Sequence, residues 1–145
     1  MKSLKTFLTA TVIITGLIIM ISSAQQPKQL GHWEAPKWAD TLSNPLKNNL
    51  EATAAGKITY NKLCAICHGD KGKGDGVAGV SLNPRPADHT SAHVQSMSDG
   101  ALYWMITNGK APMPTYKAIL KDHERWQLVN YISELGKPKS LKTKQ

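Results

Sequence analysis

The only two cysteines of this 145-residue chain stand three positions apart, and a histidine follows the second of them directly. These residues, Cys64, Cys67 and His68, belong to the segment LCAICHGDKGKGDG. Residues three apart on a helical turn are neighbours, so this spacing brings the two thiols to one side of a short helix. The fold must therefore present two sulfur atoms and an adjacent imidazole at one place.

The segment that leads into this motif, residues 53–67, has the pattern of a helix. Thr53 is a plausible N-cap, and Ile58, Leu63 and Ile66 recur on roughly one helical face. We therefore expect these three apolar side chains to form one face of the helix.

Two further helices are predicted after the motif. The first has Asp99 as its N-cap, residues 101–108 as its body and Gly109 as its stop. The last runs from about residue 122 to residue 135, begins with acidic residues that suit the helix dipole, and is ended by Gly136. No β-strand pattern stands out, so the expected fold class is all-α, with few helices and long loops.

The chain has little of its own with which to fill a core. Residues 69–96 contain five glycines and two prolines, and the whole chain has a single phenylalanine. Irregular segments of this length within a compact domain are usually functional or wrapped around something. Because a small domain with so much irregular backbone buries little apolar surface, we expect a bound group to occupy its middle.

The sequence Cys-x-x-Cys-His is the attachment signature of c-type haem, and the chemistry explains the spacing. Two thiols on one helical turn can each add to one vinyl group at a porphyrin edge and form a thioether. The next residue, His68, then projects its imidazole at the iron. One covalently attached haem c, with its iron, would also supply the missing apolar core.

Three other interpretations compete with haem. A disulfide between the cysteines leaves His68 unexplained, and a thioredoxin-like redox pair needs a βαβ context that the pattern does not show. A zinc site would use His89 and His93 in the arrangement C-x2-C…H-x3-H. The gap between its two halves is longer than in zinc fingers and is glycine-rich, so we favour haem.

An electron-transfer haem takes a second axial ligand, often methionine, which raises the reduction potential. Met113 lies between Pro112 and Pro114, and these prolines predict a stiff, extended loop that presents the thioether at a set distance. Met113 is therefore the predicted ligand. The other candidates are Met97, Met105, His89 and His93.

Taken in order, the segments CAICHG, LNPRPAD, NGKAPMPTY and WQLVNYISEL make the chain similar to a class I monohaem cytochrome c. More narrowly, CHGxxGxGDGxAG followed by MPxY resembles the small bacterial cytochromes of respiratory chains. The likeness covers about residues 53–136. It implies that Cys64 and Cys67 bear the thioethers, that His68 is the proximal ligand and that Met113 is the distal one.

The resemblance also implies how the helices cross and how the proximal histidine is held. Gly56 and Tyr60 match the face of the first helix that crosses the last helix in such proteins, here at about Leu128 and Tyr131. A proline carbonyl accepts the other N–H of the proximal histidine, and Pro84 is preferred over Pro86 for that role. Two departures from the family stand out: Lys121 occupies the expected Ser/Thr cap of the last helix, and the arm before residue 52 lies outside the family pattern.

Four parts are expected along the chain. Residues 1–24 have a basic start, an apolar run of about 15 residues and a small-residue end, which favours a cleaved secretory signal peptide over a retained membrane anchor. Residues 25–51 are read as an extended N-terminal arm whose tryptophans either fix it to the domain or contact a partner. Residues 52–137 form the cytochrome domain, and residues 138–145 form a basic tail.

These features predict a carrier of single electrons outside the cytoplasm, in the periplasm or on the outer face of the cytoplasmic membrane, and no bond-making catalysis. Loss of residues 1–24 removes two lysines and lowers the formal charge from +8 to +6, which suits electron donors and acceptors with acidic docking faces. Nucleic acid is not an expected partner of an exported chain with two arginines. The alternatives are a haem subunit fixed in a larger oxidoreductase complex and a gas sensor or peroxidase with an open iron site.

Overall fold

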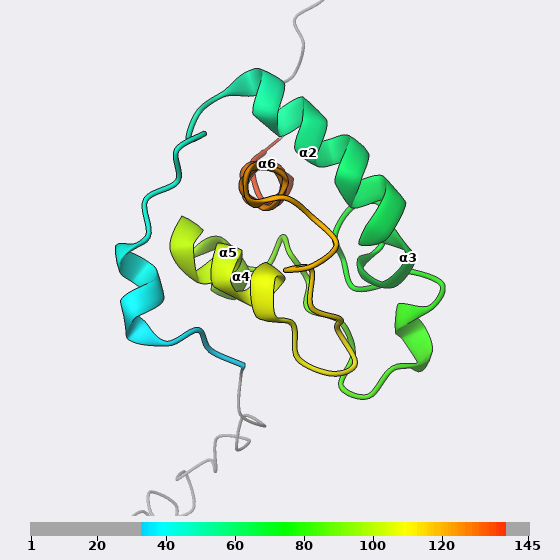
Figure 1. Ribbon diagram of the computed structural model, residues 1–145. Coiled ribbons are helices and arrows are strands. Elements are labelled where there is room, and N and C mark those ends of the chain that lie inside the picture. The colour runs from blue at the N-terminus through cyan, green and yellow to red at the C-terminus, as the bar shows by residue number, and fades with distance from the viewer. Residues whose placement is uncertain (1–32, 139–145) are drawn as a thin grey trace, which may run out of the picture. The chain divides into compact units, whose positions relative to one another are not determined.

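Helices make up the regular structure of residues 33–138, the part of the chain that this computed structural model describes (Figure 1). A 3-10 helix, η1, comes first, and a second one, η2, follows the cysteine motif. The elements in chain order are η1 (Lys37–Thr41), α2 (Leu50–Leu63), α3 (Ala65–His68), η2 (Gly79–Ser81), α4 (Ala92–Gln95), α5 (Asp99–Asn108) and α6 (Asp122–Leu135). The expected all-α class is confirmed, and the unit that holds these helices begins at Glu34.

The crossing of α2 and α6 organises the core. Figure 1 shows α6 nearly end-on, with α2 running past one side of it and α5 on the other. At the crossing, a Cβ atom on Gly56 would lie 2.0 Å from the carbonyl oxygen of Gln127. Only glycine permits this approach, and Tyr60 packs edge-on against Tyr131 beside it, with ring centroids 5.1 Å apart. The predicted crossing of these two faces is therefore what the structure has.

The inward face of α2 differs from the prediction. Its buried residues are Ala52, Gly56 and Tyr60, whereas Ile58 is 59% exposed and Ile66, in α3, is 57% exposed. The close helix crossing requires small side chains at the contact, so Ile58 points outward, whereas Leu63, at the end of α2, is partly buried against the core. The helix also begins earlier than Thr53, because the Asn49 side chain caps it by accepting a hydrogen bond from Ala52 N at 2.9 Å.

The last helix, α6, has the predicted bounds and supplies more of the buried core cluster than any other helix. Leu128 and Val129 are almost fully buried, and Trp126 stacks on Tyr103 of α5 with ring centroids 4.0 Å apart. The expected Ser/Thr cap is absent, and half of a capping box is present: the Glu124 carboxylate accepts a hydrogen bond from Lys121 N at 2.7 Å.

The short helix α5 is shifted by one residue at its start. Its N-cap is Ser98, whose hydroxyl accepts a hydrogen bond from Ala101 N at 3.0 Å, and Asp99 is its first residue. Gly109 ends it as predicted, at φ +64°. Gly100 lies so close to η1 that a Cβ there would stand 2.0 Å from the Ala39 carbonyl oxygen.

Residues 34–49 are folded onto the domain and do not form an extended arm. Ala39 is fully buried, while Trp38 is 57% exposed, so the small residue and not this tryptophan makes the contact. The Asn44 amide donates to Asn130 Oδ1 at 2.8 Å, and Asn130 in turn donates to the Leu46 carbonyl at 2.6 Å. The buried Asn130 of α6 therefore holds this segment in place.

The signal-peptide prediction for residues 1–24, the first part of the arm and the tail beyond residue 138 lie outside the described residues. Among the helices of residues 33–138, none has the length and apolar character needed to span a membrane.

Candidate functional site

The cysteine motif occupies one turn of helix at the end of α2. Cys64 ends α2 and is the N-cap of α3, and its carbonyl accepts hydrogen bonds from Cys67 N at 3.1 Å and His68 N at 2.9 Å. These bonds give the helical geometry in which residues three and four apart share a face. Both thiols are free and half-buried, and His68 is half-buried beside them. The structure thus brings together the three residues that the motif singled out.

The glycine-rich loop after the motif packs its backbone directly onto that turn. Gly76 N donates to the Cys67 carbonyl at 3.1 Å, and Ala78 N donates to the Ile66 carbonyl at 2.9 Å. A Cβ on Gly79 would lie 2.1 Å from the Cys67 oxygen. Glycines are therefore needed here, because the loop backbone approaches the motif closely and holds it in place. This packing explains why the segment after the motif is rich in glycine.

The Cys64 thiol is partly buried against the core. Burial, with a smaller effect of the neighbouring Cys67, raises the pKa of the Cys64 thiol to about 12. The thiolate is the reactive form of a cysteine, so this environment does not activate Cys64 itself.

The His68 imidazole is oriented by a backbone carbonyl. Its Nδ1 lies 3.1 Å from the oxygen of Ala87, which fits an N–H donor on Nδ1 and leaves Nε2 to bind a metal. Burial lowers the pKa of His68, an effect that this hydrogen bond partly offsets, so the neutral form is favoured. The carbonyl that meets His68 is that of Ala87, three residues beyond the preferred Pro84, so that assignment needs correction.

A second imidazole lies against the first. The His89 ring stacks on the His68 ring with centroids 4.1 Å apart and an interplanar angle of 18°. His89 therefore stands beside His68, whereas a sixth ligand has to approach iron from the opposite face of the porphyrin. This placement argues against His89 as the distal ligand.

The Met113 loop is a tight turn and not the extended segment that its prolines suggested. Lys110 N donates to the Met113 carbonyl at 3.0 Å, and Met113 N donates to the Lys110 carbonyl at 2.9 Å. Tyr116 ties the loop to α5 and to α2, since its N–H donates to the Ile106 carbonyl at 3.2 Å and its hydroxyl to the Leu63 carbonyl at 3.3 Å. The loop is thereby anchored to the residue that directly precedes Cys64.

Burial separates the candidate ligands only in part. Met113, Met97 and Cys64 are all partly buried against the same hydrophobic core. His93 is exposed on α4. No group of three or more His, Cys, Asp or Glu side chains suited to a metal ion occurs among residues 33–138, so the zinc interpretation gains no support there.

These residues fit a covalently attached haem. The donor set is a pair of unjoined thiols on one turn, an imidazole whose Nδ1 is engaged so that Nε2 is left for iron, and a thioether in an anchored loop. Cys64 and Cys67 would hold the porphyrin, and His68 would bind its iron. Soft thioether and imidazole ligands are those that haem iron takes in cytochromes c.

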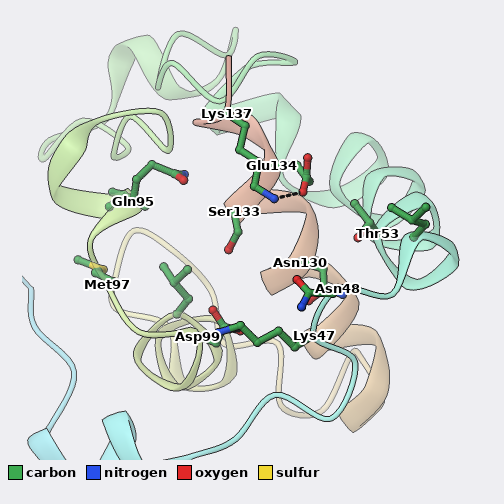
Figure 2. A pocket seen from close by; sticks show the side chains of 13 residues that line it. Lys47, Asn48, Thr53, Gln95, Met97, Asp99, Asn130, Ser133, Glu134 and Lys137 are labelled. Carbon is green, nitrogen blue, oxygen red and sulfur yellow. Dashed lines mark hydrogen bonds and ion pairs between the residues drawn. The ribbon is translucent and has the colours of Figure 1, made fainter. Parts of the chain in front are cut away.

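A hollow among the described residues lies away from the motif. It has a volume of about 460 Å³ and is lined by residues of α2, α4, α5 and α6, with Met97 and Gln95 on one side and Asn130 and Ser133 on another (Figure 2). None of the four candidate haem residues lines it. Its charged side chains form ion pairs, Lys47 with Asp99 at 3.7 Å and Lys137 with Glu134.

Comparisons with known proteins agree on one family. A family model described as cytochrome C oxidase, cbb3-type, subunit III matches residues 51–132. The chain is 32% identical over 93 residues to a Cbb3-type cytochrome c oxidase subunit CcoP of Azospirillum brasilense, and 33% identical over 84 residues to a subunit of the same name from Azospirillum sp. (strain B510). These alignments cover 62% and 57% of this chain but only 31% and 28% of the relatives, so the chain spans about a third of their length.

A solved structure is similar as well. A chain of a reducing HAO-like protein complex from Kuenenia stuttgartiensis matches with a TM-score of 0.58 and 31% sequence identity. The match covers 66% of this chain and 50% of that one.

Proposed function

The chain belongs to the cytochrome c family whose model is described as cytochrome C oxidase, cbb3-type, subunit III, and from that premise we propose that it transfers single electrons through a haem c held at residues 64–68. The observation that carries the proposal is the single helical turn that presents Cys64, Cys67 and His68, inside the region that the family model matches. When bound, haem c supplies an iron that cycles between its ferric and ferrous states.

Each residue of the site has a distinct part in this proposal. Cys64 and Cys67 would hold the porphyrin, and His68, through Nε2, and Met113 would bind its iron. The Ala87 carbonyl holds the proton of His68 on Nδ1, which fixes the tautomer and makes the imidazole a stronger ligand. Tyr116 fixes the distance between the Met113 loop and the motif through the Leu63 carbonyl. Two protein ligands leave no open position for a substrate, which suits a carrier.

Replacing Met113 with alanine tests the distal ligand. The ferric wild-type protein should show the near-infrared methionine–iron band, and its reduced form should not bind carbon monoxide readily. Met113→Ala should lose the band and gain carbon monoxide binding, whereas the matched control Met97→Ala should behave as wild type. If the band survives in Met113→Ala, this assignment is wrong. If the wild type itself binds carbon monoxide, an open site of the sensor or peroxidase kind replaces the carrier proposal.

The partners are proposed from charge. Five lysines near the site segments are exposed: Lys62, Lys71, Lys73, Lys110 and Lys117. A ring of such charges steers an acidic docking face, and that attraction weakens as salt screens it. Electron-transfer rates with a respiratory partner should therefore fall as ionic strength rises, and a flat response would reject the steering.

A fixed subunit is the second candidate, and the names of the relatives favour it. The curated relatives are oxidase subunits, and the similar solved chain belongs to a complex. Purification from the native host in mild detergent separates the two candidates: a carrier elutes as a monomer, while a subunit elutes with other chains. The mass of the N-terminus in the same sample tests whether residues 1–24 are removed, and so whether the exported protein is released or stays anchored to the membrane.

A further inference from the structure

The aromatic ring of His89 covers one face of the proposed proximal ligand. The ring centroids of His89 and His68 are 4.1 Å apart, and the two planes are within 18° of parallel. The proposed electron transfer assigns no role to His89, although its ring lies against His68.

The backbone of His89 is held from two sides. Its N–H donates to the Gly72 carbonyl at 2.6 Å, and its own carbonyl accepts from Gln95 Nε2 at 2.6 Å. Gln95 Nε2 also donates to the Ile132 carbonyl of α6 at 2.9 Å. The residue is thus fixed to the glycine-rich loop and to the core helix at once.

The ring of His89 is held as well. Its Nδ1 lies 3.2 Å from the hydroxyl of Tyr60, and that hydroxyl donates to the Gly69 carbonyl at 3.1 Å. Both bonds form together when His89 donates through Nδ1 to the Tyr60 oxygen, because a carbonyl can only accept. Tyr60 is fully buried between α2 and α6, so the ring of His89 rests on the most rigid part of the fold.

We propose that His89 is a positioning residue that holds the plane of the His68 imidazole, and through it tunes the electronic state and reduction potential of the haem iron. The inference rests on the proposed function, since it takes His68 as the proximal ligand. The hydrogen bond to Ala87 fixes the direction in which Nδ1 points. The flat face of His89 fixes the tilt of the ring about that direction, which a single hydrogen bond leaves free.

The tilt matters because the plane of an axial imidazole decides which iron orbitals its π electrons overlap. In a low-spin ferric haem that overlap sets the splitting seen by electron paramagnetic resonance, and groups around a metal ligand tune its potential. The flat face of the His89 ring lies against the His68 imidazole, so His89 acts on it through its shape.

The test compares two substitutions of similar bulk in the holoprotein. His89→Phe keeps a flat ring against His68, while His89→Leu fills the space without one. Resonance spectra of the ferric protein should show shifted and broadened g values in His89→Leu, with a changed midpoint potential, and values close to wild type in His89→Phe. The matched control is His93→Leu, an exposed histidine on α4, which should leave both readouts unchanged.

Wild-type g values and potential in His89→Leu overturn the inference. If that variant does not mature, Tyr60→Phe serves in its place, because it frees the His89 ring from its Nδ1 partner. Broadened resonance lines in Tyr60→Phe support the inference, and wild-type line widths overturn it. A wild-type protein without covalent haem would overturn the proposed function itself, which the haem content of every sample reports separately.

Discussion

Replacing Gly56 with alanine should destabilise the folded domain, although the same change stabilises most helices. A Cβ at this position would lie 2.0 Å from the Gln127 oxygen and 2.5 Å from the Gln127 carbonyl carbon. Real Cβ contacts essentially never fall below 3.0 Å. Because both atoms belong to the backbone of α6, no side chain can rotate away, and α2 and α6 must separate by about 1 Å.

The sign of the effect follows from two opposing contributions. Forcing extra volume into a packed contact typically costs about 1–3 kcal/mol, and a backbone neighbour places this site at about the upper end. Replacing a helical glycine with alanine gains about 1 kcal/mol. The net loss should be about 2 kcal/mol, which lowers the melting temperature of a domain of this size by roughly 8–16 °C.

Thermal unfolding of the holoprotein, followed by far-ultraviolet circular dichroism, measures this difference. Asn61→Ala is the matched control, since it changes an exposed residue of the same helix and should raise stability by about 0.5 kcal/mol. If Gly56→Ala also raises the melting temperature, the close approach of α2 and α6 is wrong.

Two further perturbations test the segment before α2 and the start of α6. Asn130→Ala removes the partner of the Leu46 carbonyl and of the Asn44 amide, so we expect the free energy of unfolding to fall by about 1–3 kcal/mol. Proteolysis at residues 42–49 should be faster, and unchanged cleavage would contradict the role of Asn130 in holding this segment. The pKa of Asp122 is lowered, chiefly by the Tyr103 hydroxyl and also by Arg125, whose Nη2 lies 3.0 Å away. A carboxyl group whose pKa is lowered in the folded protein stabilises the fold at pH values above its pKa in the unfolded chain, about 3.9. This stabilisation is lost as the pH falls through the lower pKa of the folded protein. Asp122→Asn should therefore be less stable than wild type at neutral pH and equal to it in strong acid, and a pH-independent difference would contradict this.

Local signals predicted the last helix and the motif. The bounds of α6 follow from acidic residues at its start and Gly136 at its end, which are features of the helix itself. The motif at residues 64–68 needs only one helical turn, so its spacing is meaningful without the rest of the fold. The close approach at Gly56 was expected from the family resemblance, and the structure has it.

Other features depend on packing that no local pattern contains. Ile58 belongs to the apolar face that the sequence predicts, but the crossing of α2 with α6 buries Ala52 and Gly56 instead. The small size of these two residues gives no periodic signal in the sequence. The carbonyl that orients His68 is that of Ala87, and any residue type can supply a carbonyl. The stacking of His89 on His68 joins residues 21 positions apart, and it arises only once the glycine-rich loop has folded back.

The most direct test of the account is the covalent state of the two thiols. The protein should be isolated from its native host and measured by intact mass spectrometry together with a pyridine haemochrome spectrum. The account predicts a red protein whose mass exceeds that of its polypeptide by one haem, with neither Cys64 nor Cys67 open to alkylation. A colourless protein in which both thiols react would contradict it.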